Sequence, residues 1–248
     1  MRKRLIFGMA VLLAFCSCPA YSFAEIKNRA YWEARGDIVW DIHTKEKVIA
    51  LTFDDGPDPR YTGQILQLLD KYKAKGTFFV MGHKAEKNPS LLQEMQAKGH
   101  EIANHTYRHP HLRSISSANL KKEIKATDDV IYSITGKYPS LFRPPGGVYD
   151  DKVVEAAKSQ HHLVIMWSWT QDTKDWTNPG VQRIVTKVCK NAKPGNVVLF
   201  HDSGGNRTQT VKAVEIILDR LSKEGYQFVT VSQLLSYKEK KASSRNAK

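Results

Sequence analysis

Seven short apolar runs, separated by stretches of helical periodicity, set the pattern of this sequence of 248 residues. The runs are rich in Val, Ile and Phe and do not alternate strictly with polar residues, which is typical of strands covered on both faces. They occupy residues 48–53, 77–81, 101–104, 140–143, 163–167, 196–200 and 227–230. Strands of this kind alternating with helices predict an α/β fold with parallel strands, either a closed or incomplete βα barrel or a doubly wound sheet.

The segments between the runs carry apolar stripes, as expected of helices that cover a sheet. Two stripes with the spacing i, i+3, i+4, i+7 are Ile65, Leu68, Leu69 and Tyr72, and Val214, Ile217, Leu218 and Leu221. Four glycines each follow such a helix and precede a strand, where a left-handed helix C-cap is expected. They are Gly76, Gly99, Gly136 and Gly225. No break in composition interrupts the pattern, so we expect one domain.

Residues 1–24 indicate a secretory signal peptide. Basic residues at positions 2–4 precede an apolar core at 5–15, which is shorter than the roughly 20 residues that span a bilayer. We expect cleavage near Ala24, and an uncleaved membrane anchor is the alternative. The exported protein then has a polar lead-in at 25–45, a globular domain at 46–237 and a flexible basic tail at 238–248, and is secreted or associated with the cell wall.

Cysteine content and charge constrain stability and partners. Cleavage removes Cys16 and Cys18 and leaves Cys189 alone, so no intramolecular disulfide is expected and a packed core must stabilise the fold. The formal net charge of +13 favours an anionic partner, either nucleic acid or an anionic cell wall. Because the charge is spread without a recognised nucleic-acid-binding module, we expect the wall and no nucleic acid. We also expect a monomer without a stable protein partner.

Polar residues follow several of the predicted strands, at the edge where parallel βα folds bind ligands. The first strand ends in Asp54-Asp55 followed by Gly56-Pro57, which terminates the strand and lets both carboxylates serve one site. A helix-capping turn is the alternative interpretation of this pair.

Two histidines, His105 and His109, follow the third strand at a spacing of i, i+4. One helical turn would bring both imidazoles to the same side. Two histidines with a carboxylate form a common triad for zinc and related divalent ions. Taken alone, the spacing also fits a purely structural pair.

Three more polar clusters lie near later strands. They are Arg143-Pro144-Pro145-Gly146-Gly147, the segment from Asp172 to Trp176, and Leu199-Phe200-His201-Asp202. Five polar clusters at successive strand ends are hard to explain as separate structural accidents.

In this order, the TFDDGP segment, the two histidines, the Arg-Pro-Pro-Gly segment, DxxDW and Leu-x-His resemble the polysaccharide deacetylases of the NodB-homology type, carbohydrate esterase family 4. The resemblance covers about residues 46–237. It implies a distorted or incomplete (β/α)7 barrel with parallel strands and outer helices. It also implies divalent-metal hydrolysis of N-acetyl groups on amino-sugar polymers.

The resemblance assigns a role to each matching residue. Asp55, His105 and His109 would hold the metal. We expect zinc, with cobalt, manganese or nickel as alternatives. A metal of this kind lowers the pKa of the water bound to it. The catalytic residues would be the general base Asp54, the general acid His201, and the orienting residues Arg143 and Asp175. The substrate-binding residues would be Pro145, Gly146, Trp176 and Leu199. A backbone N–H near Gly146, together with the metal, would stabilise the oxyanion.

Two details bear on the substrate. The residue after Pro145 is commonly aromatic in the family, whereas Gly146 stands here, so an aromatic wall of the sugar site is missing. Some muramic-acid deacetylases of the superfamily carry Asn at the second acidic position, whereas this chain keeps Asp55. Asp55 therefore favours an N-acetylglucosamine deacetylase, and the signal, the basic chain and the basic tail favour peptidoglycan of an anionic wall as its substrate. The alternatives are a chitooligosaccharide deacetylase, an acetylxylan O-deacetylase with the same residues, or a non-catalytic protein that binds wall glycan.

Overall fold

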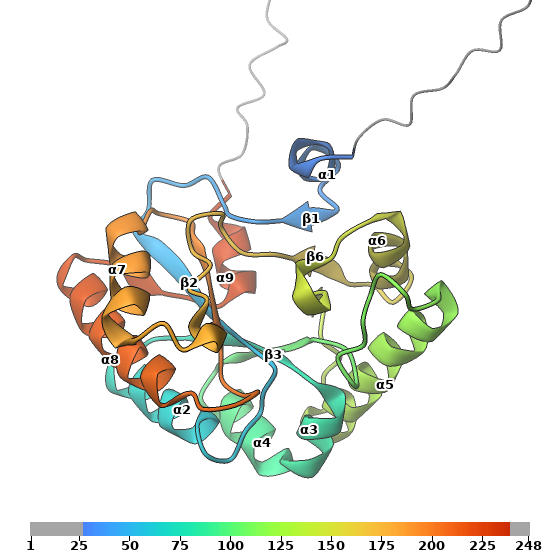
Figure 1. Cartoon of the computed structure of the whole chain (residues 1–248), viewed down its shortest axis with the longest axis horizontal. Coiled ribbons are helices and arrows are strands. Elements are labelled where there is room, and N and C mark those ends of the chain that lie inside the picture. The colour runs from blue at the N-terminus through green and yellow to red at the C-terminus, as the bar shows by residue number, and fades with distance from the viewer. Residues whose placement is uncertain (1–26, 239–248) are drawn as a thin grey trace, which may run out of the picture.

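The computed structural model describes residues 27–238, which form one curled parallel sheet with helices around it (Figure 1). The predicted signal peptide and residues 239–248 of the predicted tail lie outside this range, so both stay predictions. In the described part of the chain, none of the helices is long and apolar enough to cross a membrane.

All seven predicted strands are present, and one further strand precedes them. The strands are β1 (Ile38–Val39), β2 (Val48–Asp54), β3 (Gly76–Val80), β4 (Glu101–Asn104), β5 (Leu141–Phe142), β6 (Leu163–Ile165), β7 (Val197–His201) and β8 (Gln227–Phe228). Their order is β1-β6-β5-β4-β3-β2-β7, with β8 paired to β2, and the ladders between these strands are all parallel.

The sheet forms a half-barrel that an irregular segment joins across its gap. After β6 the chain turns toward β7, where Ser168 N–H donates to Val197 O at 3.0 Å and Leu199 N–H donates to Gln171 O at 3.1 Å. Helices surround the curled sheet on its outside (Figure 1). This arrangement confirms the predicted incomplete barrel and excludes the doubly wound sheet.

The helices are α1 (Arg29–Arg35), α2 (Thr62–Lys71), α3 (Gly82–Lys87), α4 (Pro89–Ala97), α5 (Ser117–Thr135), α6 (Asp151–Lys158), α7 (Val181–Asn191), α8 (Thr208–Lys223) and α9 (Val231–Ser236). Two short 3₁₀ turns, η1 (Pro145–Gly147) and η2 (Asp175–Thr177), lie in the loops after β5 and β6. The predicted stripes of α2 and α8 face the sheet, and Ile65, Leu69 and Ile217 are fully buried.

Side chains of the central strands alternate between the helix layer and the barrel interior. Phe53 points to the helices and stacks on Phe78 and Phe200 of the two flanking strands, with ring centroids 5.0 and 5.6 Å apart. Because neighbouring residues on a strand face opposite sides, Thr52 and Asp54 point into the interior. The register of β2 therefore places a carboxylate at the mouth of the barrel.

Three of the four predicted glycine caps are left-handed, with φ between 71° and 84° at Gly99, Gly136 and Gly225. The prediction for Gly76 is wrong, because Gly76 begins β3 and Lys73, with φ of 53°, takes the left-handed position after α2. An added Cβ at Gly76 would lie 3.1 Å from Leu69 Cδ1, so close packing explains the glycine.

The polar lead-in contains α1 and β1, which the sequence pattern did not indicate. Strand β1 extends the sheet beyond β6, and Trp40, 2% exposed, follows it. The lead-in also reaches the opposite edge, where Ile42 N–H donates to Gly195 O at 2.9 Å. These residues thus help to join the two edges of the half-barrel.

Candidate active site

Asp54 and Asp55 lie where β2 ends at the mouth of the barrel. Asp54 is the last residue of the strand and is 3% exposed. In a continued strand Asp55 would point to the opposite face. Its backbone is left-handed instead, with φ of 73°, and both carboxylates line the same cleft.

His105 and His109 approach Asp55 from the loop after β4. Their Nε2 atoms both lie 3.5 Å from Asp55 Oδ1. The expected helical turn is wrong: the segment is a loop with left-handed residues at Thr106 and His109, with φ of 67° and 56°. Asn104 Oδ1 accepts the Thr106 N–H at 2.8 Å and fixes the start of this loop.

The cluster of Asp55, His105 and His109 fits a divalent metal ion. One ligand atom from each residue lies within 4.8 Å of the others. Asp55 Oδ1 is buried and has no hydrogen-bond partner within residues 27–238, which leaves it available for a cation. The Nδ1 of His105 lies 2.7 Å from Arg143 O, so its N–H can donate there and leave Nε2 free as a ligand.

The protonation states of these groups also suit a cation. Burial alone would raise the pKa of Asp55, but the imidazoles of His105, His201 and His109 hold it well below its usual range. Burial lowers the pKa of His109, which favours the neutral imidazole that binds metals.

Asp54 is held by a buried arginine rather than by the histidine cluster. The Nη1 of Arg143 donates to Asp54 Oδ1 at 2.8 Å and to Thr52 Oγ1 at 2.7 Å. Its Nη2 donates to Met166 O at 2.9 Å, and its guanidinium stacks 4.1 Å from the Phe79 ring centroid. Arg143 is thus locked in one orientation behind Asp54.

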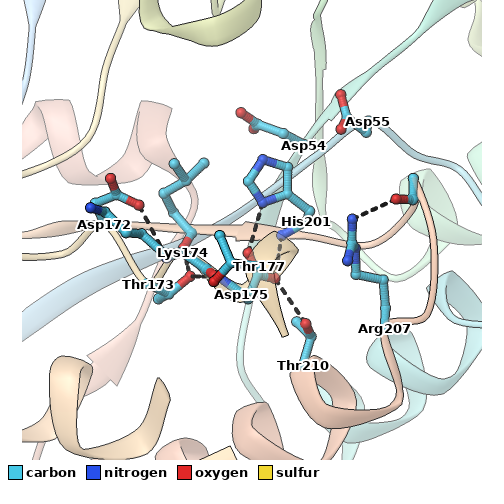
Figure 2. Close-up of polar contacts among 12 residues, drawn as sticks. Asp54, Asp55, Asp172, Thr173, Lys174, Asp175, Thr177, His201, Arg207 and Thr210 are labelled. Carbon is cyan, nitrogen blue, oxygen red and sulfur yellow. Dashed lines mark hydrogen bonds and ion pairs between the residues drawn. The ribbon is translucent and has the colours of Figure 1, made fainter. Parts of the chain in front are cut away.

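His201, at the end of β7, is positioned by Asp175. The Nδ1 of His201 lies 2.8 Å from Asp175 Oδ1, and the His201 backbone N–H donates to Asp175 Oδ2 at 2.9 Å (Figure 2). Thr210 Oγ1 donates to the same Oδ2 at 2.8 Å. Burial opposes protonation of His201, yet the Asp175 hydrogen bond and charge, with Asp54 and Asp55 nearby, raise its pKa to about 8.

The candidate residues surround one cleft with a cavity volume of about 440 Å³. The predicted residues that line it are Asp54, Asp55, His105, His109, Gly146, Trp176, Leu199 and His201. Arg143 and Asp175 lie behind the wall, as residues that orient others would. Pro145, predicted to bind substrate, is buried outside the lining, and Pro144 takes its place.

Gly146 sits where the sequence suggested a missing aromatic wall. It is exposed, and an added Cβ would have no atom within 4 Å, so the cleft is open at this point. Gly147 is enclosed instead, because an added Cβ would lie 2.6 Å from Trp167 Cη2.

The cleft also includes residues that no sequence motif indicated, among them Gly204 and Arg207. Arg207 is 3% exposed and donates to Ser203 O at 2.7 Å and to Gly204 O at 2.8 Å, which shapes the loop after β7 (Figure 2). The basic charge of Arg207 does not by itself indicate, from the sequence, that this residue shapes the loop.

Comparison with known proteins connects this site to a family. A profile of the polysaccharide deacetylase family matches residues 41–165. A peptidoglycan-N-acetylglucosamine deacetylase of Bacillus cereus is 48% identical over 206 residues, which are 83% of this chain and 96% of the relative. The chain belongs to the polysaccharide deacetylase family. Members of this family, carbohydrate esterase family 4, are hydrolases that act on acetyl groups of polysaccharides and generally need a divalent metal.

Solved structures of polysaccharide deacetylases share the fold. The crystal structure of the Bc1960 peptidoglycan N-acetylglucosamine deacetylase matches with a TM-score of 0.79 at 32% identity, over 84% of this chain and 98% of that chain. A family pseudoenzyme from Bacillus anthracis, BA3943, also matches, with a TM-score of 0.73 at 28% identity, over 80% and 68%. Because a pseudoenzyme has the same fold, the fold alone does not imply catalysis, which depends on the side chains of the cleft.

Proposed function

We propose that this polysaccharide deacetylase is a secreted, divalent-metal-dependent enzyme that removes the acetyl group from N-acetylglucosamine residues of peptidoglycan. The observation that carries the proposal is the arrangement of one cleft. Asp55, His105 and His109 converge there beside the carboxylate of Asp54 and the imidazole of His201. This arrangement supports the roles in metal binding, base catalysis and acid catalysis that we assign to these residues.

The chain's own side chains divide the hydrolysis between them. When bound, the metal supplies a Lewis acid that acidifies water and polarises the acetamide carbonyl. Asp54, which accepts a hydrogen bond from Arg143, takes the proton of the attacking water. The water oxygen forms the new bond to the acetyl carbon. We assign the Gly146 N–H to the developing oxyanion, since the Gly147 N–H already donates to Pro144 O.

His201 completes the reaction at the leaving nitrogen. Its raised pKa keeps the imidazole protonated at neutral pH, so it can give a proton to the nitrogen as the carbon–nitrogen bond breaks. The products are acetate and a free amine on the sugar. Trp176 and Leu199 line the part of the cleft that we assign to the acetyl methyl group.

We propose zinc as the metal, because two imidazoles and one carboxylate are a common zinc ligand set that leaves positions open for water. The signal-like residues 1–24 support export. The glucosamine assignment is supported by Asp55, which this chain keeps at the second acidic position, and by the name of the Bacillus cereus relative.

The test is acetate release from three substrates. Zinc-loaded protein is incubated with peptidoglycan, chitooligosaccharides and acetylated xylan, with Asp54→Asn as the control. We expect the highest rate on peptidoglycan, free glucosamine in the digested product, and no acetate from the control. A preference for either other polymer would contradict the assigned substrate. Wall binding without acetate from any of the three would favour the non-catalytic alternative.

A further inference from the structure

Helix α3 contacts the loop that carries the two histidines. The backbone N–H of Gly82 donates to Thr106 O at 3.0 Å, and the N–H of His83 donates to Tyr107 O at 3.2 Å. An added Cβ at Gly82 would lie 2.5 Å from Tyr107 Cδ2, so the helix start and the loop are in close contact. The first turn of α3 therefore fixes the backbone between His105 and His109.

The same helix contacts the loop that carries Asp55. Just before the helix, the Met81 N–H donates to Gly56 O at 2.9 Å. Within it, Lys84 Nζ donates to Asp55 O at 2.8 Å and to Ser203 Oγ at 2.8 Å. Ser203 lies two residues after His201, so Lys84 also joins the loop of the candidate general acid to the Asp55 loop.

The partners of Lys84 are unusual for an ammonium group. Within residues 27–238 no carboxylate oxygen lies within 4.0 Å of its Nζ, although Asp58 and Asp202 are near enough to feel its charge. A lysine that bonds to a backbone carbonyl and a hydroxyl fixes the direction of that carbonyl rather than balancing a charge. The carbonyl belongs to Asp55, a non-glycine residue in the left-handed region, where backbone geometry must be enforced by its surroundings.

We propose that Lys84 is a positioning residue of the metal centre. Its ammonium group holds the Asp55 carbonyl and so keeps the left-handed backbone that turns the Asp55 carboxylate toward His105 and His109. Because Gly82 and His83 hold the histidine loop, one short helix sets the relative position of all three ligands. This inference rests on the proposed metal site.

The test compares zinc affinity by competition with a chromogenic chelator. In Lys84→Met the hydrogen bonds are lost, and we expect zinc affinity to fall by about ten- to hundredfold, as for other residues that orient metal ligands. Lys87→Met is the matched control, because Lys87 is an exposed lysine of the same helix. It should bind zinc like the wild type. Ser203→Ala, which leaves the Asp55 bond intact, should also stay close to the wild type.

The readout separates positioning from general stability. Thermal unfolding of each variant identifies the folded fraction, and affinity is compared in folded protein only. If Lys84→Met does not fold, Lys84→Leu, which also lacks a hydrogen-bond donor, takes its place. Wild-type zinc affinity in either folded Lys84 variant, or an equal loss in Ser203→Ala, overturns the proposal. Failure of the wild type to bind zinc overturns both this inference and the proposed metal-dependent function.

Discussion

At the residue scale, the chemistry of the cleft depends on charged side chains that other buried side chains hold in place. Asp54 accepts a hydrogen bond from Arg143, and His201 is paired with Asp175. Each pair combines a group at the cleft with a partner behind its wall. The partner sets the direction of the group that faces substrate, and Asp175 also raises the pKa of His201 against the effect of burial.

The Asp175–His201 pair predicts the alkaline limit of activity. As pH rises through the His201 pKa of about 8, the imidazole loses the proton it must donate, so kcat should fall. Asp175→Asn removes the carboxylate that raises this pKa, and the alkaline limb should move to lower pH. The measurement is the pH profile of acetate release at saturating substrate.

Asp172→Asn is the control for this profile. Asp172 also lines the cleft, but its Oδ1 accepts the Lys174 N–H and it makes no hydrogen bond to His201 (Figure 2). The alkaline limb of the pH profile of Asp172→Asn should lie at the same pH as that of the wild type. An alkaline limb that does not move in Asp175→Asn would show that another group sets it.

Sequence motifs predicted most of the cleft because four of the five directly follow or end a strand, whereas the DxxDW segment lies in the loop between β6 and β7. Asp54 and His201 are the last residues of neighbouring parallel strands and are paired in register, so the topology brings them together. The left-handed backbone of Asp55 and the partners of Lys84 could not be predicted in this way. They depend on loop geometry, which leaves no periodic signal in a sequence.

At the scale of elements, the lead-in is part of the packed structure. Trp40 follows β1, packs edge to face on Tyr149 with centroids 5.3 Å apart, and has the Arg29 guanidinium over its ring. The two residues of β1 are too few for a strand signal. Sequence patterns therefore indicated a polar segment where the structure has an edge strand.

Truncation of Trp40 should be costly. Trp40→Ala is expected to lower the free energy of unfolding by about 3–5 kcal/mol, the usual loss for a large buried aromatic side chain. Trp169→Ala is the matched control, since Trp169 is 72% exposed, and it should change stability by no more than about 0.5 kcal/mol. Chemical denaturation measures both. Equal losses in the two variants would contradict the packing role of the lead-in.

At the scale of the whole molecule, helix α7 carries basic side chains and no acidic ones. Residues 176–200 contain no Asp or Glu, and Arg183, Lys187 and Lys190 fall at i, i+4, i+7 on one side of α7. The helix lies on the outside of the molecule beside α8, a few residues after Trp176 of the cleft (Figure 1). We expect this stripe to attract an anionic wall polymer.

The stripe predicts salt-sensitive retention on peptidoglycan. Replacing its three cations by Gln should lower the NaCl concentration that releases the protein from sedimented walls. The matched control replaces three lysines that pair with acids, Lys71, Lys125 and Lys223. This control variant loses the same net charge, but the NaCl concentration that releases it should be close to that of the wild type. Equal shifts in the two triple variants would show that net charge alone, not the α7 stripe, controls retention.

Alternation of strands and helices predicted parallel strands but left the barrel and the doubly wound sheet as alternatives, and the family resemblance favoured the incomplete barrel. All seven expected strands are present. The gap is joined by Ser168 and Gln171 and by the lead-in, none of which carries strand periodicity. Those contacts arise from the curvature of the finished sheet, a property of the whole molecule.

The most direct test of the account is a titration of metal-free protein with zinc while acetate release from peptidoglycan is measured. Asp55, His105 and His109 define one site per chain, so the rate should rise with added zinc and stop rising at one equivalent. In His105→Ala, the rate should not rise and level off at one equivalent of zinc. A full rate of acetate release in chelator-treated protein without added metal would contradict the claim that the enzyme depends on a metal at this site.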